Sequence, residues 1–197
     1  RRGDYILATK VGMKVGEAPE DENTSPEAIR IQLRRSLARM RTDYVDVYYL
    51  HRYDPDTEPH AVARAMGEEL RAGTIRAWGV SNYTAAQLAA LLGLGIGLTP
   101  SGGDFLCGML AGSILAGRQR EPFFLALRAE IAAGLSQTND ISAAFLQCAL
   151  DGQFSEPVLA LTKPEPEAAR IAESFSKIGH SSGFDTLCGI VFCLRQP

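Results

Sequence analysis

Short apolar runs alternate with helical repeats along the first half of the chain. Runs rich in β-branched and aromatic residues predict strands at residues 5–9, 44–50 and 74–80. Apolar residues that recur every three or four positions predict helices at residues 26–40, 60–71 and 84–92. This alternation is typical of parallel βαβ units, in which the carboxyl ends of the strands share one edge of the sheet.

Residues that favour helix caps mark the limits of these helices. Ser25 can cap the first helix, with Pro26 in its first position. Gly73 ends the second helix, and Thr84 can cap the third, which runs to Leu92. Each helix is therefore predicted with a defined start or end.

Polar residues follow each predicted strand, at the edge where ligands gather in parallel sheets. Lys10 follows the first strand, His51 follows the second, and the pair Ser81 and Asn82 follows the third. Taken singly, each has a structural explanation: a surface charge, a loop histidine, and a turn that caps the next helix. Their convergence on one edge of one sheet favours a ligand site.

Helices dominate the second half of the sequence. Helix-like composition occupies residues 105–116, 121–135, 138–150, 165–178 and 184–194. The best strand-like stretch is residues 157–161. Residues 93–102 are rich in glycine, but they follow a helix and lack the GxGxxG spacing, so a Rossmann interpretation is excluded there.

One octet occurs twice in this half, as SGGDFLCG at residues 101–108 and as SGFDTLCG at residues 182–189. The agreement predicts two similar local structures at the starts of two apolar helices, where Ser and Asp are natural caps. Two interpretations stay open. The octets form capped helices that pack as a pseudo-symmetric pair, or their N–H and hydroxyl groups bind an anion. In the second case the substrate- or anion-binding residues are Ser101, Asp104, Ser182 and Asp185.

Composition narrows the classes of partner. A net charge of −3 argues against a nucleic-acid surface, and no apolar run approaches the roughly 20 residues that span a bilayer. Four cysteines without a CxxC pair and only three histidines indicate neither a metal site nor a disulfide framework. We therefore expect a cytoplasmic protein that acts on a small-molecule substrate, with a partner chain as an open alternative.

Three segments of residues 1–92 combine these polar residues with ordinary structural ones: ATKVG, SPEAIRIQLRRSLARMRTDYVDVYYLHRYDP and ELRAGTIRAWGVSNYTAAQL. In this order and spacing they resemble the third to fifth strand-helix units of the aldo-keto reductase family. The resemblance implies a (β/α)₈ barrel that reduces aldehydes and ketones with NADPH. It also implies that Lys10 lowers the pKa of a catalytic tyrosine and that His51 orients the substrate carbonyl. Ser81 and Asn82 would hold the nicotinamide carboxamide.

The expected fold class follows from this resemblance and from the helical second half. We expect an α/β chain, with a partial (β/α) barrel-like segment of three parallel strands in residues 1–92 and a mainly α-helical segment in residues 93–197. The catalytic tyrosine of the family, and the aspartate that pairs with its lysine, are expected on earlier segments that this chain does not contain. The catalytic site is therefore expected to be incomplete.

Three further segments carry distinctive motifs: GIGLTPSGGDFLCGMLAG, SQTNDISAAFLQCALDGQFSEPVLAL and IGHSSGFDTLCGIVFCL. They resemble the carboxyl-terminal half of the family of the oxamate carbamoyltransferase subunit AllH. The resemblance implies a role in carbamoyl transfer within allantoin-derived nitrogen metabolism. The chain departs from that pattern at Gly103, where a second aspartate is expected beside Asp104.

These features make an aldo-keto reductase-like oxidoreductase that uses NADPH the main functional hypothesis. The alternatives are a carbamoyltransferase-like anion-binding module and a non-catalytic fusion of two fragments joined near residues 89–93.

Overall fold

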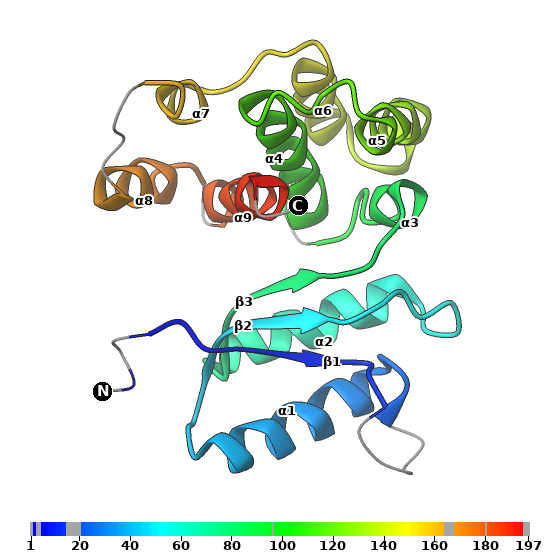
Figure 1. The fold of residues 1–197 in the computed structure, drawn as a ribbon. Coiled ribbons are helices and arrows are strands. Elements are labelled where there is room, and N and C mark those ends of the chain that lie inside the picture. Colours follow the sequence, from blue (N-terminus) through cyan, green and yellow to red (C-terminus); the bar gives the residue numbers. More distant parts are fainter. Residues whose placement is uncertain are drawn as a thin grey trace. The chain divides into compact units, whose positions relative to one another are not determined.

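The computed structural model describes residues 2, 5–14, 21–95, 97–163, 168–179 and 181–194. The chain forms two compact units, Arg1–Tyr83 and Thr84–Pro197. The first unit holds a parallel sheet with helices, and the described part of the second unit holds helices (Figure 1). The expected fold class, a three-strand parallel segment followed by a mainly α-helical one, is confirmed.

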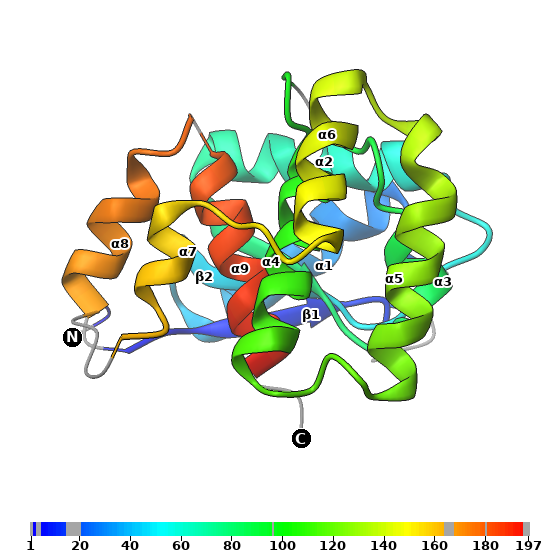
Figure 2. The same cartoon turned by 90° about the horizontal axis from the view of Figure 1, so that it is seen from above.

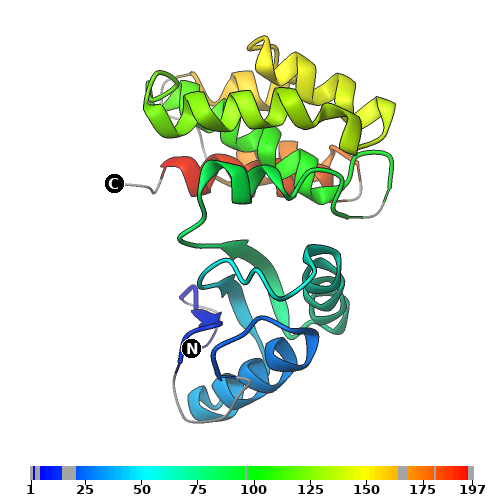
Figure 3. The same ribbon diagram turned by 90° about the vertical axis from the view of Figure 1, so that its right-hand side faces the viewer.

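The first unit contains a three-stranded parallel sheet in the order β1-β2-β3. The strands span Ala8–Val11, Val45–Leu50 and Ile75–Val80. Helices α1 (Pro26–Met40) and α2 (Pro59–Ala72) connect the strands and lie next to each other on one face of the sheet (Figure 3). The opposite face carries the alternate side chains of the strands, because successive residues of a strand point to opposite faces.

Local caps begin and end these two helices. The Ser25 side chain accepts a hydrogen bond from the backbone N–H of Ala28 (3.2 Å), with Pro26 in the first turn, as predicted. Gly73 ends α2 in the left-handed conformation (φ 76°), also as predicted. The start of α2 is capped by the Glu58 carboxylate, which accepts from two backbone N–H groups. Glutamate is not among the favoured caps, so the sequence does not indicate it.

Strand β1 begins later than predicted. The N–H of Leu7 donates to Oδ2 of Asp46 on β2 (2.9 Å) instead of continuing the ladder between strands. The same carboxylate accepts from the guanidinium groups of Arg2 (2.8 Å) and Arg76 (3.0 Å). Asp46 thus anchors the segment before β1, and regular strand pairing starts after Leu7.

Tyr48 connects β2 to α1 in the core of the first unit. Its side chain is fully buried, and its hydroxyl donates to the backbone oxygen of Ile29 (3.1 Å). We expect Tyr48→Phe to lower the free energy of unfolding of this unit by about 1 kcal/mol, because one buried hydrogen bond is lost while the ring remains. Denaturant unfolding followed by Trp78 fluorescence measures the change. Tyr49→Phe is the control, and an equal loss in that variant would contradict this role of Tyr48.

The α-helices described in the second unit are α3 (Ala85–Ala89), α4 (Ser101–Leu115), α5 (Pro122–Gly134), α6 (Asp140–Leu150), α7 (Glu156–Ala160), α8 (Ala168–Ser176) and α9 (Ser182–Leu194) (Figure 2). A short 3₁₀ helix, Leu135–Gln137, follows α5. Of the helix predicted at residues 165–178, residues 165–167 lie outside the described residues. Helix α4 packs against α5, α6 and α9, and its Leu106, Met109 and Leu110 are fully buried. Across the described parts of the chain, every helix falls short of the length and apolar character that a bilayer crossing demands.

Residues 157–161 form a helix where the sequence predicts a strand. Helix α7 begins after Ser155, a residue type that favours helix caps, and Pro157 lies in its first turn. Val158 packs with Phe175 in a small core cluster. Start signals and the burial of one helical face thus outweigh the strand propensity of this apolar run.

The border between the compact units falls after Tyr83, whereas the border predicted from the resemblances lies after residue 92. Helix α3 lies between these two positions and packs against α5. Thr84 caps α3, as predicted, in a capping box with Gln87. A segment that resembles one family therefore packs with helices that resemble the other.

Candidate functional site

His51 and Ser81 lie side by side because the parallel ladder continues one residue beyond the ends of β2 and β3. Lys10, predicted to follow the first strand, instead lies within β1. The N–H of His51 donates to the carbonyl oxygen of Val11 (2.8 Å), and the N–H of Ser81 donates to that of Leu50 (2.9 Å). Ligand sites of parallel sheets form at this carboxyl edge. We refer to Lys10, His51, Ser81 and Asn82 as the rim.

Three rim residues share the face of the sheet that α1 and α2 do not cover. Lys10 on β1 pairs with Tyr49 on β2, and Tyr49 pairs with Gly79 on β3. Paired residues share a face, as do residues two positions apart, so His51 and Ser81 continue the row. Lys10 is exposed, whereas His51 and Ser81 are half-buried. The fold therefore brings these predicted residues to one surface.

Asn82 is fastened to the neighbouring loop. Its backbone is left-handed (φ 59°), a conformation that asparagine adopts more readily than most residues. Its Nδ2 donates a hydrogen bond to the carbonyl oxygen of His51 (2.8 Å). This bond fixes the orientation of the amide and leaves Oδ1 as the acceptor that Asn82 can offer to a ligand.

The imidazole of His51 contains a buried nitrogen, Nδ1, that has no hydrogen-bond partner among the described residues. Leaving such an atom unpaired costs about 1–3 kcal/mol. Because this nitrogen is shielded from solvent, the polar groups that Ser81 and Asn82 offer to a ligand are the Ser81 hydroxyl and Oδ1 of Asn82. A hydroxyl and an amide oxygen fit an amide group of a ligand.

Asp54 fixes the loop that follows β2, a role that no pattern in the sequence indicates. Its Oδ2 accepts hydrogen bonds from the N–H (2.8 Å) and hydroxyl (3.2 Å) of Thr24 and from the hydroxyl of Thr57 (2.7 Å). Burial alone would raise the pKa of Asp54, but the hydrogen bonds from Thr24, Thr57 and Asp56 outweigh burial and lower it. The ionised carboxylate thus joins the loop after β2 to the segment that leads into α1.

An aromatic pair joins the loops after β2 and β3. The rings of Tyr53 and Tyr83 meet edge to face, with centroids 5.6 Å apart. Burial raises the pKa of Tyr83 to about 12, so its hydroxyl stays protonated at neutral pH. Each tyrosine follows its strand at the same interval, and this regular spacing is the sequence signal that could have revealed the pair.

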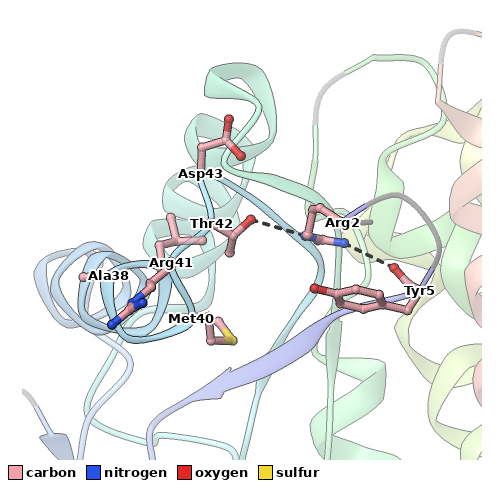
Figure 4. Close-up of a pocket in the computed structure, with 8 residues that line it drawn as sticks. Arg2, Tyr5, Ala38, Met40, Arg41, Thr42 and Asp43 are labelled. Atoms are coloured by element: carbon pink, nitrogen blue, oxygen red, sulfur yellow. Dashed lines mark hydrogen bonds between the residues drawn. The ribbon is translucent and has the colours of Figure 1, made fainter.

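A surface depression of about 500 Å³ lies at the opposite, amino-terminal edge of the sheet (Figure 4). Arg2 donates to the hydroxyl of Thr42 (3.2 Å) and to the carbonyl oxygen of Tyr5 (3.2 Å). It also forms the ion pair with Asp46 (2.8 Å). Because Arg2 already has these partners, we assign this depression no ligand.

In the second unit, the octets form the first turns of α4 and α9 and pack against each other reciprocally. A Cβ atom added at Gly108 would lie 2.0 Å from the carbonyl oxygen of Thr186. One added at Gly189 would lie 2.1 Å from that of Phe105, the equivalent of Thr186 in the other octet. The interpretation of the octets as a pseudo-symmetric pair of helices is confirmed.

The predicted capping role of the octet serine is wrong for α4. Ser101 is the first residue of the helix, and Pro100 occupies the cap position without a side-chain bond. The hydroxyl of Ser101 instead forms a hydrogen bond with the carboxyl group of Asp185 on α9. Reciprocally, the hydroxyl of Ser182 forms a hydrogen bond with the carboxyl group of Asp104 on α4. We refer to Thr99, Ser101, Asp104, Ser182 and Asp185 as the octet cluster.

Burial raises the pKa of both aspartates of the octet cluster. The pKa of Asp104 rises to about 6, because burial and the charge of Asp185 outweigh the hydrogen bonds from Ser182 and Thr99. Burial likewise raises the pKa of Asp185, against the hydrogen bond from Ser101. The Oδ2 atom of each aspartate is buried without a hydrogen-bond partner among the described residues.

The neighbouring groups of the octet cluster limit its chemistry. Burial raises the pKa of Cys107 to about 12 and that of Cys188 to about 11, so both thiols stay protonated at neutral pH. A Cβ atom at Gly103 would lie 2.7 Å from Oγ of Ser142 on α6, so an aspartate there would meet α6. Within the described parts of the chain, no three His, Cys, Asp or Glu side chains gather as a metal site.

Parallel strands joined by helices place the first unit in the α/β class. The chain belongs to the aldo/keto reductase family over residues 1–104 and to the family of the oxamate carbamoyltransferase subunit AllH over residues 91–194. Both resemblances recognised in the sequence are confirmed.

Individual relatives match the first part of the chain. The 6-dehydroglucose reductase of Novosphingobium aromaticivorans is 41% identical over 90 residues, which are 46% of this chain and 29% of that protein. A probable voltage-gated potassium channel subunit beta of Oryza sativa is 39% identical over 88 residues, 45% of this chain and 26% of that protein. The holo form of the aldo-keto reductase AKR11C1 from Bacillus halodurans is 35% identical, covers 44% of this chain and 30% of its own, and superposes with a TM-score of 0.40. The chain thus spans less than a third of the length of these relatives.

Proposed function

We propose that the rim forms the nicotinamide- and carbonyl-facing part of an NADPH-dependent carbonyl reductase site. The observation that carries this proposal is the hydrogen bond from Nδ2 of Asn82 to the carbonyl oxygen of His51 (2.8 Å). It joins the two loops that carry the proposed cofactor and substrate contacts. Membership of the aldo/keto reductase family and the names of reductase relatives support the proposal.

Each rim residue has a distinct proposed role. The hydroxyl of Ser81 and Oδ1 of Asn82 bind the carboxamide of the cofactor, which supplies the hydride when bound. The imidazole of His51 hydrogen-bonds to the substrate carbonyl and orients it. Hydride transfer builds negative charge on the carbonyl oxygen, and the cation of Lys10 favours that charge. The resemblance to the aldo-keto reductase family implies that a tyrosine outside residues 1–92 donates the proton. The rim itself therefore supplies orientation of the substrate and electrostatic stabilisation.

Calorimetric titration of the chain with NADPH tests this proposal. We expect one NADPH to bind per chain, and Asn82→Ala to weaken binding about tenfold, since both a hydrogen bond to the ligand and the loop fastening are lost. Ser81→Ala is a second variant that leaves the loop fastening intact. Glu27→Ala, an exposed change on α1, is the control. Absence of NADPH binding to the wild-type chain would exclude the proposed site.

The octet cluster supports a second candidate function. We propose that residues 91–194 form a ligand-binding module for carbamoyl transfer, which the AllH family match and the reciprocal octets support. The anion-binding role of Ser101, Asp104, Ser182 and Asp185 stays a prediction. Calorimetric titration with carbamoyl phosphate and with oxamate tests it. A chain that binds neither of these nor NADPH would be a non-catalytic fusion.

A further inference from the structure

Two buried carboxylate oxygens in the octet cluster lack partners at equivalent positions of the repeat. Oδ2 of Asp104 and Oδ2 of Asp185 are both buried without a hydrogen bond from any described residue. Asp104 is only 9% exposed. Buried carboxylate oxygens are nearly always paired, because desolvation without a compensating partner is costly. Two such atoms in one reciprocal arrangement indicate a shared ligand between the starts of α4 and α9.

The charge of the cluster determines the charge of that ligand. Among the described residues, hydroxyl groups form hydrogen bonds with both carboxyl groups, and the negative charge of Asp185 repels that of Asp104. No described arginine or lysine appears among these groups. Two carboxylates close together attract a cation, and an anion such as oxamate would then bind the cluster through that cation.

The donor atoms determine which cations fit. The cluster offers carboxylate oxygens from Asp104 and Asp185 and hydroxyl oxygens from Ser101, Ser182 and Thr99, with Oγ1 of Thr99 lying 2.8 Å from Oγ of Ser182. Oxygen ligands select hard cations such as Mg²⁺, Mn²⁺ and Ca²⁺. The protonated thiols of Cys107 and Cys188 offer no soft ligand.

We propose that the octet cluster binds one divalent hard cation between the amino-terminal turns of α4 and α9. The two aspartates balance its double charge, and the hydroxyl groups and water complete its coordination. A site with two carboxylates binds more weakly than one with three or more, and it keeps room for an oxygen-bearing ligand on the cation. The proposal does not rest on the reductase function of the first unit.

Titration of the metal-free whole chain with Mn²⁺, followed by electron paramagnetic resonance of the free ion, tests the proposal. We expect one Mn²⁺ per chain, displaced by Mg²⁺ or Ca²⁺, and a loss of affinity of at least tenfold in Asp104→Asn and in Asp185→Asn. Asp140→Asn is the matched control, because Asp140 is an exposed aspartate in the first turn of α6 of the same unit.

Two results would overturn the proposal. One is a wild-type chain that binds no Mn²⁺, whose carboxyls then share a proton instead of a metal ion. The other is an affinity for Mn²⁺ that is as high in Asp104→Asn and Asp185→Asn as in the control variant Asp140→Asn. Circular dichroism of each variant verifies its helical content. If both asparagine variants misfold, Ser101→Ala and Ser182→Ala take their place, with a loss of about threefold each expected.

Discussion

Gly108→Ala is expected to destabilise the helical unit by about 3 kcal/mol. The new methyl carbon would lie 2.0 Å from the carbonyl oxygen of Thr186, so α4 and α9 would have to separate. A backbone oxygen in a helix cannot move aside as a flexible side chain does. The gain in helix propensity from glycine to alanine, about 1 kcal/mol, is smaller than this loss. Denaturant unfolding followed by circular dichroism measures the difference.

The reciprocal packing makes a matching prediction for the second octet. Gly189→Ala should destabilise the unit to a similar degree, because its methyl carbon would lie 2.1 Å from the carbonyl oxygen of Phe105. The double variant should lose less than the sum of the two, since the first substitution already separates the helices. Ile114→Ala, at a 40% exposed position on α4, is the control and should cost less than about 1 kcal/mol. Unchanged stability in Gly108→Ala would contradict the close contact of the octets.

Asp54→Ala is expected to lower the free energy of unfolding of the first unit by about 2–3 kcal/mol, because a group of hydrogen bonds to one ionised carboxylate is lost. The N–H and hydroxyl of Thr24 and the hydroxyl of Thr57 would lose their shared acceptor. Unfolding followed by Trp78 fluorescence reports on this unit. Asp56→Ala is the matched control, because Asp56 is exposed in the same loop.

The contribution of Asp54 should also depend on pH. Its pKa is lowered in the folded chain, so its stabilising effect is fully present above the unfolded-state pKa, about 4, and is lost as pH falls through the folded-state pKa. The stability difference between the wild type and Asp54→Ala should therefore shrink below about pH 4. A difference that grows on acidification would show that the carboxylate is not the stabilising form.

The sequence predicts those parts of the fold that local signals control. Ser25 and Thr84 begin helices and Gly73 ends one because capping depends on neighbouring backbone groups. The rim could be predicted as well, because parallel strands bring the residues after them to one edge. His51 and Ser81 accordingly continue the parallel ladder at this edge.

Contacts between distant residues could not be predicted in this way. The bond between Asp54 and Thr24 joins two loops that local patterns treat separately. The octets suggested a pair of helices. The reciprocal hydrogen bonds, from the Ser182 hydroxyl to Asp104 and from the Ser101 hydroxyl to Asp185, depend on how α4 and α9 cross. That crossing is permitted by the close approach of the two helices at Gly108, Gly112 and Gly189, which appears only in the packed structure.

Thermal unfolding followed by the fluorescence of Trp78, with and without NADPH, tests the central claim most directly. Trp78 is the only tryptophan and lies in β3, in the unit that carries the rim. We predict a single transition whose midpoint rises with NADPH, by the equivalent of about 2.7 kcal/mol at a hundred times the dissociation constant. The rise should be smaller in Asn82→Ala. A wild-type midpoint that NADPH leaves unchanged would contradict a nicotinamide site at the rim.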